Sequence, residues 1–340
     1  MPTETWFIYA LGGGWGHLNR AIALARLAAR DRHIHLLTNS PYADRLLSFG
    51  SECSITLHLL PEETSVADAR EFVQSTLRAV DYDCLIVDTF PRGLLGELAE
   101  LIPQQQSVCR ILVHRDITPD YIAAKDLRPF VAANYDGILI PGETDPPLAY
   151  LPQAKVTAPW LSRHSSELAS VSRSDWFVLD QRLAQRPVVV VCAAGQPQEV
   201  ALFGRITSQL ATALPTVTVR CLAASCPTTS APELWISHWP GMELLQFADV
   251  VVGSGGYNLV HECAALKVPL VAIALRRRYD RQARRILQHG HLVERVGDIV
   301  SAVRVLIQKK RVCKTPDYEN GVEDAIAHIK TWNRGKQRSQ

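Results

Sequence analysis

Short apolar runs alternate with segments of helical periodicity along almost the whole chain, and this alternation constrains the fold more than any other feature. The runs CLIVD at 84–88 and RILVH at 110–114 are apolar on both faces, which is typical of parallel strands covered by helices on each side. Alternation of this kind predicts a doubly wound parallel sheet, the α/β class. Because 340 residues exceed one ordinary hydrophobic core, we expect two such domains of about 150 residues each.

The periodicity also predicts where the individual elements lie. In the first half we expect strands at 6–11, 33–38, 55–60, 84–88, 108–114 and 137–141, and helices at 18–30, 42–49, 66–80 and 94–102. In the second half we expect strands at 188–192, 217–222, 234–238, 250–253 and 270–274, and helices at 199–214, 242–247, 257–266 and 281–289.

A proline-bearing stretch separates the two halves. Residues 142–162 contain four prolines and show no clear period, so we interpret them as an interdomain linker. We expect a Rossmann-like domain at 1–160, a second one at 161–316, and a tail at 317–340. Two sheets facing each other would form a cleft, and ligands bind at the carboxyl ends of parallel strands.

Composition excludes several classes of protein. The chain is 47% hydrophobic and 21% charged, which is typical of a globular protein. Its formal net charge of +2 lacks the strong basic excess typical of nucleic-acid-binding proteins. The eight cysteines lack zinc spacing and are expected to be reduced. No signal sequence or spanning run is present, so we expect a cytoplasmic protein, at most peripheral to the inner face of a membrane. The arginine cluster at 276–285 either forms a solvated basic surface or attracts phosphates or anionic lipid head groups.

The first glycine loop, 12–17, reads GGGWGH and follows the first predicted strand. Its glycines, including Gly13 and Gly16, permit a sharp turn and close approach to a ligand, and the helix behind them offers N–H groups to an anion. It fits neither the dinucleotide fingerprint nor the P-loop. Two interpretations of His17 are open: a general base acting near neutral pH, or a histidine that merely caps the helix.

A second glycine loop stands between the strand at 250–253 and the next helix. Ser254, Gly255 and Gly256 can hold a diphosphate on backbone N–H groups, and the carboxylate of Glu262 can accept two hydrogen bonds from a ribose diol. The alternative is a tight turn followed by a surface glutamate. The sequence is compatible with both interpretations of this loop.

Two further loops follow predicted strands. Asp280 and Gln282 stand at the carboxyl end of a predicted strand, where their polar side chains can bind sugar hydroxyls. Gly195 lies in a loop with a weaker signal for ligand binding, AAGQP at 193–197. The motif DYD at 81–83 mimics a metal-binding DxD but precedes a strand, so we interpret it as a solvated turn. We predict no dedicated metal site.

Taken together, these loops resemble those of the GT-B glycosyltransferases. Gly12, Gly13, Gly16 and His17 are in register with the GGTGGH loop of the lipid-linked N-acetylglucosaminyltransferase of peptidoglycan synthesis. The run 254–262 resembles the HCGWNSxxE donor signature of UDP-glycosyltransferases, with matches at Gly256, Asn258 and Glu262. The run DRQ at 280–282 resembles the end of the donor site in both families. CLIVDTF at 84–90 resembles the VxDxF strand whose aspartate, here Asp88, orients the catalytic histidine.

This resemblance implies two Rossmann-like domains and a metal-independent, inverting transfer from a nucleotide diphosphate sugar, best matched by a UDP-sugar, to an acceptor hydroxyl. His17 would be the base and Asp88 its orienting acid. The acceptor would be a small molecule or a lipid, no cofactor besides the co-substrate is implied, and a C-terminal helix at 321–332 would return to the first domain. The implied donor-binding residues are Gly13, Gly16, Arg163, Gly195, Ser254, Gly255, Gly256, Asn258, Glu262, Asp280 and Gln282.

Departures from the family pattern leave other functions open. Ser254 replaces the signature's first histidine, which weakens diphosphate binding, and Ala283 replaces a second glutamine, which leaves the donor sugar undefined. The alternatives are a sugar-nucleotide epimerase or hydrolase on the same fold, and a catalytically silent nucleotide-sugar-binding protein. A nicotinamide dehydrogenase is disfavoured because neither half contains GxGxxG with a following acid. The sequence specifies neither the acceptor nor the oligomeric state.

Overall fold

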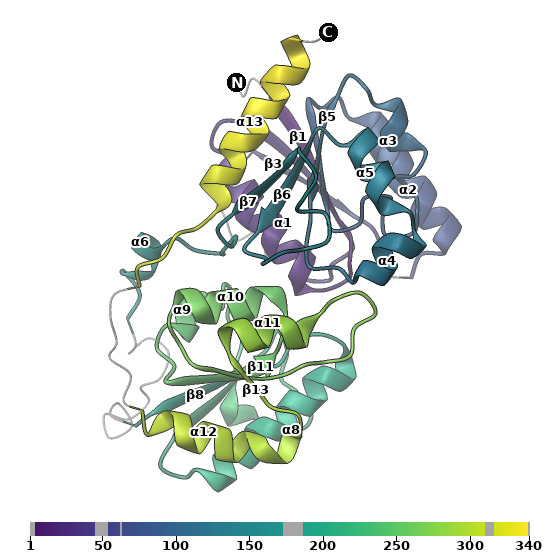
Figure 1. The fold of residues 1–340 in the computed structure, drawn as a ribbon. Helices are drawn as coiled ribbons and strands as arrows, with labels where there is room; N and C mark the ends of the chain where they lie inside the picture. Colours follow the sequence, from purple (N-terminus) through teal and green to yellow (C-terminus); the bar gives the residue numbers. More distant parts are fainter. Residues whose placement is uncertain (1–3, 45–53, 62, 173–185, 310–315, 339–340) are drawn as a thin grey trace. The chain divides into compact units, whose positions relative to one another are not determined.

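The computed structural model describes residues 4–44, 54–61, 63–172, 186–309 and 316–338 (Figure 1). The chain divides into two compact units. Unit 1 comprises Met1–Leu161 together with Asn320–Gln340, and unit 2 comprises Ser162–Glu319. Each unit is a parallel sheet with helices, which confirms the predicted α/β class with two doubly wound sheets.

Unit 1 contains a seven-stranded parallel sheet in the order β3-β2-β1-β4-β5-β6-β7. The strands are β1 (Thr5–Ala10), β2 (His33–Thr38), β3 (Ile55–Leu59), β4 (Cys84–Asp88), β5 (Cys109–Val113), β6 (Gly137–Pro141) and β7 (Ala154–Thr157). The helices are α1 (Trp15–Ala28), α2 (Val66–Ala79), α3 (Leu101–Gln104), α4 (Pro119–Ala124), α5 (Leu127–Asn134) and α13 (Val322–Arg338). The residues of β4, β5 and β6 are all buried, as their two-sided apolar sequence requires.

Unit 2 contains a six-stranded parallel sheet in the order β10-β9-β8-β11-β12-β13. The strands are β8 (Val188–Cys192), β9 (Thr218–Leu222), β10 (Trp235–Ile236), β11 (Val250–Ser254), β12 (Leu270–Ile273) and β13 (His291–Leu292). The helices are α6 (Ser165–Leu168), α8 (Pro197–Ala213), α9 (Met242–Leu245), α10 (Tyr257–Ala265), α11 (Gln282–His289) and α12 (Ile299–Ile307), with short 3-10 turns at Pro232–Leu234 and Val296–Asp298.

Each sheet reverses its strand order at one place. In unit 1 the reversal lies between β1 and β4, and in unit 2 it lies between β8 and β11. On either side of this point the crossover helices cover opposite faces of the sheet. Their connecting loops therefore diverge, which opens a crevice beyond the carboxyl ends of the strands. The loops singled out by the sequence follow these same strands.

Three expectations about elements were wrong. The stretch 142–162 is not a linker, because it contains β7, the edge strand of the unit 1 sheet. The helix expected at 94–102 is only Leu101–Gln104, because Gly93 and Gly96 adopt φ of 82° and 84°, which interrupts a right-handed helix. Helices α4, α5, α6 and α12 and the edge strand β13 were not expected. Residues 45–49 of the helix expected at 42–49 lie outside the described residues.

The C-terminal helix α13 belongs to unit 1, where it packs against α1 and against β5, β6 and β7 (Figure 1). Its buried face includes Val322, Ala325 and Ile329. Trp332 lies directly on Gly137, where an added Cβ would come within 2.5 Å of the indole ring. Among the described residues, no helix is long and apolar enough to cross a membrane.

Candidate functional site

His17 and Asp88 meet at the unit 1 reversal. His17 is the third residue of α1, and Asp88 is the last residue of β4. The His17 imidazole Nδ1 lies 2.5 Å from Asp88 Oδ2. The N-cap residue of α1 is Gly14, and His17 bonds Asp88 of β4, so His17 does not merely cap the helix. The crossover that makes β4 the neighbour of β1 brings together two residues that are 71 positions apart.

Arg20 completes this group and was not predicted as a site residue. Its guanidinium donates to both oxygens of Asp88, from Nε to Oδ1 at 3.1 Å and from Nη2 to Oδ2 at 2.7 Å. The Arg20 side chain is only 1% exposed. Its spacing of three residues from His17 places both on one face of α1, and this was the signal available in the sequence.

The surroundings set the protonation of the pair. Burial opposes ionisation of Asp88, but Arg20 and His17 outweigh it and hold the pKa of Asp88 far below its usual range. Burial lowers the pKa of His17; Asp88 opposes this, and the nearby charges of Arg20 and Arg115 lower it further. At neutral pH the structure therefore holds a neutral imidazole beside an ionised carboxylate.

These charges also select the tautomer of His17. An ionised carboxylate only accepts hydrogen bonds, so Nδ1 of His17 carries the proton and donates to Asp88. Nε2 then holds the lone pair, and it makes no hydrogen bond to any residue that the structure describes. The His17 side chain is 15% exposed. This is the arrangement of a general base that is oriented by an acid.

The glycine loop shapes the space around the imidazole. A Cβ at Gly12 would overlap the His17 ring, and Gly13 adopts φ of 68°, so both positions require glycine. A Cβ at Gly16 would meet nothing within 4 Å. The N–H groups of Gly12 and Gly13 both donate to Asn39 Oδ1 at 2.8 Å. Asn39 thus occupies two of the donors that the sequence suggested for a ligand.

Thr89 follows Asp88 in a strained conformation. Its φ is 72°, which is rare for a β-branched residue and costs on the order of 1–3 kcal/mol. The Thr89 hydroxyl donates to Asp88 Oδ2 at 3.2 Å, and Arg20 Nη2 lies 3.3 Å from the same hydroxyl. The strained residue therefore lies beside the carboxylate that orients His17. Strained backbone conformations are commonly found at functional sites.

The unit 2 reversal carries the second glycine loop. Ser254 ends β11, and Gly256 is the N-cap residue of α10, so the first N–H groups of α10 face away from the helix body. A Cβ at Gly255 would lie 2.7 Å from Ile286 Cδ1 and 2.9 Å from Gln282 Cβ. Gly255 is therefore needed for the close packing of α11 against this loop.

Glu262 lies on α10 and is buried at 7% exposure, so the interpretation as a surface glutamate was wrong. The Ser162 hydroxyl lies 3.3 Å from Glu262 Oε1. Asn258 lies one turn earlier on the same face of α10 and is partly buried. Arg163 follows Ser162, and its Nε donates to Glu243 Oε1 at 2.8 Å. The geometry places Asn258, Glu262 and the backbone of Arg163 in one region of unit 2.

Asp280 lies between β12 and α11, Gln282 is the first residue of α11, and both form hydrogen bonds near the glycine loop of unit 2. Asp280 Oδ1 accepts from Arg285 Nη2 at 2.8 Å, and the buried Arg285 also donates to the Gly255 carbonyl at 3.0 Å. The Gln282 side-chain oxygen accepts from the Leu275 N–H at 3.0 Å. Both side chains thus support the backbone around the loop, a role that the sequence did not indicate.

Gly195 lies at the start of α8 with φ of 116°, and a Cβ there would overlap the carboxylate of Glu199. Glu199 accepts from the Gln196 N–H at 2.9 Å and forms a two-bond ion pair with Arg277. Arg277 and Arg285 are both held by carboxylates, so the arginine cluster is not simply a solvated face. Neither Glu199 nor its pairing with Arg277 was predicted.

The predicted site residues therefore fall into two groups. Gly13, Gly16, His17 and Asp88 lie in unit 1, and the remaining ones lie in unit 2. Across the part of the chain that the structure describes, no three His, Cys, Asp or Glu side chains are grouped as a metal site requires.

Comparisons with known proteins identify the fold. No protein-family model matches the chain, and no curated protein matches it. A spinosyn rhamnosyltransferase, solved with thymidine diphosphate, is 12% identical with a TM-score of 0.59, over 98% of this chain and 96% of that one. A glycosyltransferase from Streptomyces nogalater is 14% identical with a TM-score of 0.56, over 98% and 95%. A structure assigned as a UDP-N-acetylglucosamine 2-epimerase of Listeria monocytogenes is 11% identical with a TM-score of 0.60, over 96% and 95%. At these identities the likeness establishes the fold alone.

Proposed function

Because the chain has the GT-B fold, we propose that it is a glycosyltransferase that moves a sugar from a nucleoside diphosphate sugar to the hydroxyl of an acceptor. The observation that carries this proposal is the pair His17–Asp88, in which a neutral imidazole is held 2.5 Å from an ionised carboxylate. A protein that only bound nucleotides would gain nothing from a buried, oriented base.

In the proposed reaction, His17 Nε2 removes the proton of the acceptor hydroxyl as its oxygen bonds to the anomeric carbon of the donor. The bond from that carbon to the diphosphate breaks on the opposite side, so the configuration inverts. Asp88 stabilises the imidazolium that forms, as the acid does in catalytic triads. N–H groups at the start of α10 donate hydrogen bonds to the leaving diphosphate, so the proposed reaction uses no metal.

Unit 2 is the proposed donor site, with the nucleotide recognised through its ribose. The buried carboxylate of Glu262 suits a ribose with two adjacent hydroxyls, because each can donate to one carboxylate oxygen. This favours UDP over thymidine diphosphate, although the spinosyn enzyme was solved with the latter. The other proposed donor-binding residues of unit 2 are Arg163, Gly195, Ser254, Gly255, Gly256, Asn258, Asp280 and Gln282. Gly13 and Gly16, which are also proposed to bind the donor, lie in unit 1.

A second candidate function is an epimerase or hydrolase that acts on the nucleotide sugar alone. The similarity to the Listeria structure, with a TM-score of 0.60, is as strong as the similarity to the glycosyltransferases. Donor turnover in the absence of any acceptor would favour this alternative over transfer.

The test is calorimetric titration of the full chain with UDP, thymidine diphosphate, GDP and CDP. We expect one diphosphate to bind selectively and the Glu262→Ala variant to lose at least tenfold in affinity, since a buried charged hydrogen bond is lost. Glu294→Ala, which removes an exposed carboxylate of the same unit, is the matched control. Binding that is absent, or indifferent to Glu262, would refute the proposed donor site.

A further inference from the structure

The Arg277–Glu199 ion pair lies beside the glycine loop of unit 2. Glu199 lies in the first turn of α8, after β8, and Arg277 lies in the loop after β12. In the sheet, β11 stands between these two strands, with Val252 paired to Val191 of β8 and Ser254 paired to Ile273 of β12. The ion pair therefore joins the two loops that flank the carboxyl end of β11, where the glycine loop begins.

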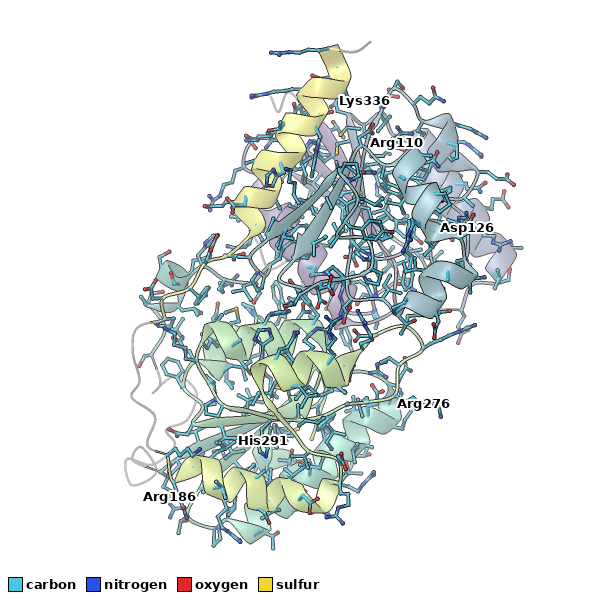
Figure 2. All side chains as sticks on the ribbon, viewed as in Figure 1. Arg110, Asp126, Arg186, Arg276, His291 and Lys336 are labelled. Atoms are coloured by element: carbon cyan, nitrogen blue, oxygen red, sulfur yellow. The ribbon has the colours of Figure 1, made fainter. Side chains whose placement is uncertain are left out.

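This ion pair is well formed yet accessible. Both guanidinium nitrogens of Arg277 bond the two oxygens of Glu199, with Nη2 at 2.8 Å from Oε2. The hydrogen bonds that Arg277 donates to Glu199 raise the pKa of Arg277 above its usual range. The Arg277 side chain is nevertheless 33% exposed, so it has room to exchange partners. Arg276, which projects outward from the same loop in Figure 2, is exposed.

The glycine loop itself supplies only neutral donors. Ser254 offers one hydroxyl and the start of α10 offers backbone N–H groups, whereas a departing diphosphate concentrates at least two negative charges. The buried Arg285, with its side chain 1% exposed, is held by Asp280 and Gly255, and Arg163 is 18% exposed and bonded to Glu243. Of these three arginines, Arg277 is the most accessible.

We propose that Arg277 is a diphosphate-binding residue of this chain, held beside the glycine loop by Glu199 and transferred to the diphosphate when the nucleotide enters. This inference rests on the proposed function, since it names a further residue of the proposed donor site. A guanidinium forms the same two-bond contact with a phosphate as with a carboxylate, and a diphosphate carries the larger charge.

Glu199 has a second role that makes the exchange possible. Its carboxylate accepts from the Gln196 N–H at the start of α8, so it keeps a hydrogen-bond partner after Arg277 leaves. A glutamine at this position can make the same capping contact. Glu199→Gln therefore removes the charge that competes for Arg277 while the helix start stays capped.

The experiment compares Arg277→Met with Arg276→Met, which removes an equal charge from the same loop. UDP affinity is measured by calorimetry, and uridine, which lacks phosphate, is measured by ligand-observed NMR. We expect Arg277→Met to weaken UDP binding at least tenfold, with uridine binding changed less than about twofold. Arg276→Met is expected to weaken UDP binding by less than about threefold. Equal effects of the two variants on UDP would overturn the proposal.

Glu199→Gln supplies the opposite test, because it is expected to tighten UDP binding several-fold by releasing Arg277. If Arg277 only braced the loop, Glu199→Gln would leave UDP affinity unchanged, and Arg277→Met would lower the melting temperature without a selective loss of UDP. That result would overturn this inference and leave the donor site in place. A wild-type protein that bound neither UDP nor inorganic pyrophosphate would overturn both this inference and the proposed function.

Discussion

The guanidinium of Arg20 donates hydrogen bonds to both carboxylate oxygens of Asp88, from Nε to Oδ1 at 3.1 Å and from Nη2 to Oδ2 at 2.7 Å. Oδ2 is shared, because it also lies 2.5 Å from His17 Nδ1. A buried carboxylate that is held from two sides cannot rotate away from the imidazole. The group therefore comprises three residues, in which Arg20 holds Asp88 in place and Asp88 holds the imidazole of His17.

The role of His17 predicts a loss of catalysis without a loss of donor binding. His17→Gln removes the lone pair that accepts the proton, so we expect kcat for sugar transfer to fall by about 10²–10⁴. UDP affinity is expected to stay within about twofold, measured by calorimetry. His291→Gln, an exposed histidine of unit 2, is the control and should keep full activity. A His17→Gln enzyme with more than a tenth of wild-type kcat would exclude the base role.

The charge of Arg20 predicts a shift of the pH profile. Burial is the main cause that lowers the pKa of His17, and the positive charge of Arg20 adds to it. Without that charge the pKa of His17 rises, so less of the neutral base is present at a given pH. We expect Arg20→Met to move the acid limb of kcat to higher pH, with activity at pH 6 falling more than activity at pH 8. Arg20→Lys keeps the charge and should shift the limb less. An unmoved limb in Arg20→Met would contradict this coupling.

Asp88 and Arg20 also predict a pattern of stability. Asp88→Asn removes the carboxylate charge that faces the buried Arg20 guanidinium, which is expected to cost about 3–5 kcal/mol. The double variant Asp88→Asn/Arg20→Met removes both charges and should recover much of this loss, because an apolar side chain then fills the site. Urea unfolding of the single and double variants measures the coupling. Additive losses would mean that the two residues do not act as a pair.

Gly12 predicts a steric effect on the base. A Cβ at this position would overlap the imidazole of His17, so Gly12→Ala must push the ring away from Asp88. We expect kcat to fall at least tenfold, while UDP affinity is kept because Gly12 is not among the proposed donor-binding residues. Gly14→Ala, where a Cβ meets nothing within 4 Å, should leave kcat within about twofold. Similar effects at the two glycines would show that the overlap at Gly12 is relieved at no cost.

The sequence determined the α/β class and most of the strands, because side-chain periodicity is a local property. His33–Thr38, Cys84–Asp88, Gly137–Pro141 and Val188–Cys192 begin and end where the apolar runs do. It failed where backbone geometry overrides composition. At 94–102, the positive φ of Gly93 and Gly96 interrupts a helix that the apolar pattern favoured, and at 142–162 the prolines hid the edge strand β7.

The candidate site was only half determined by the sequence. It singled out His17, Asp88, the glycine loops and Glu262, since these stand at the end of a predicted strand, in the loop after it, or in the first two turns of the helix that follows. Only the tertiary structure decided their partners. Arg20 on Asp88, Asn39 on the first glycine loop and Arg277 on Glu199 depend on which strands become neighbours in the sheet. The order of strands follows from long-range packing, and local sequence carries no record of it. The periodicity of this chain therefore determined its elements, and the crossovers at the two reversal points decided which charges meet.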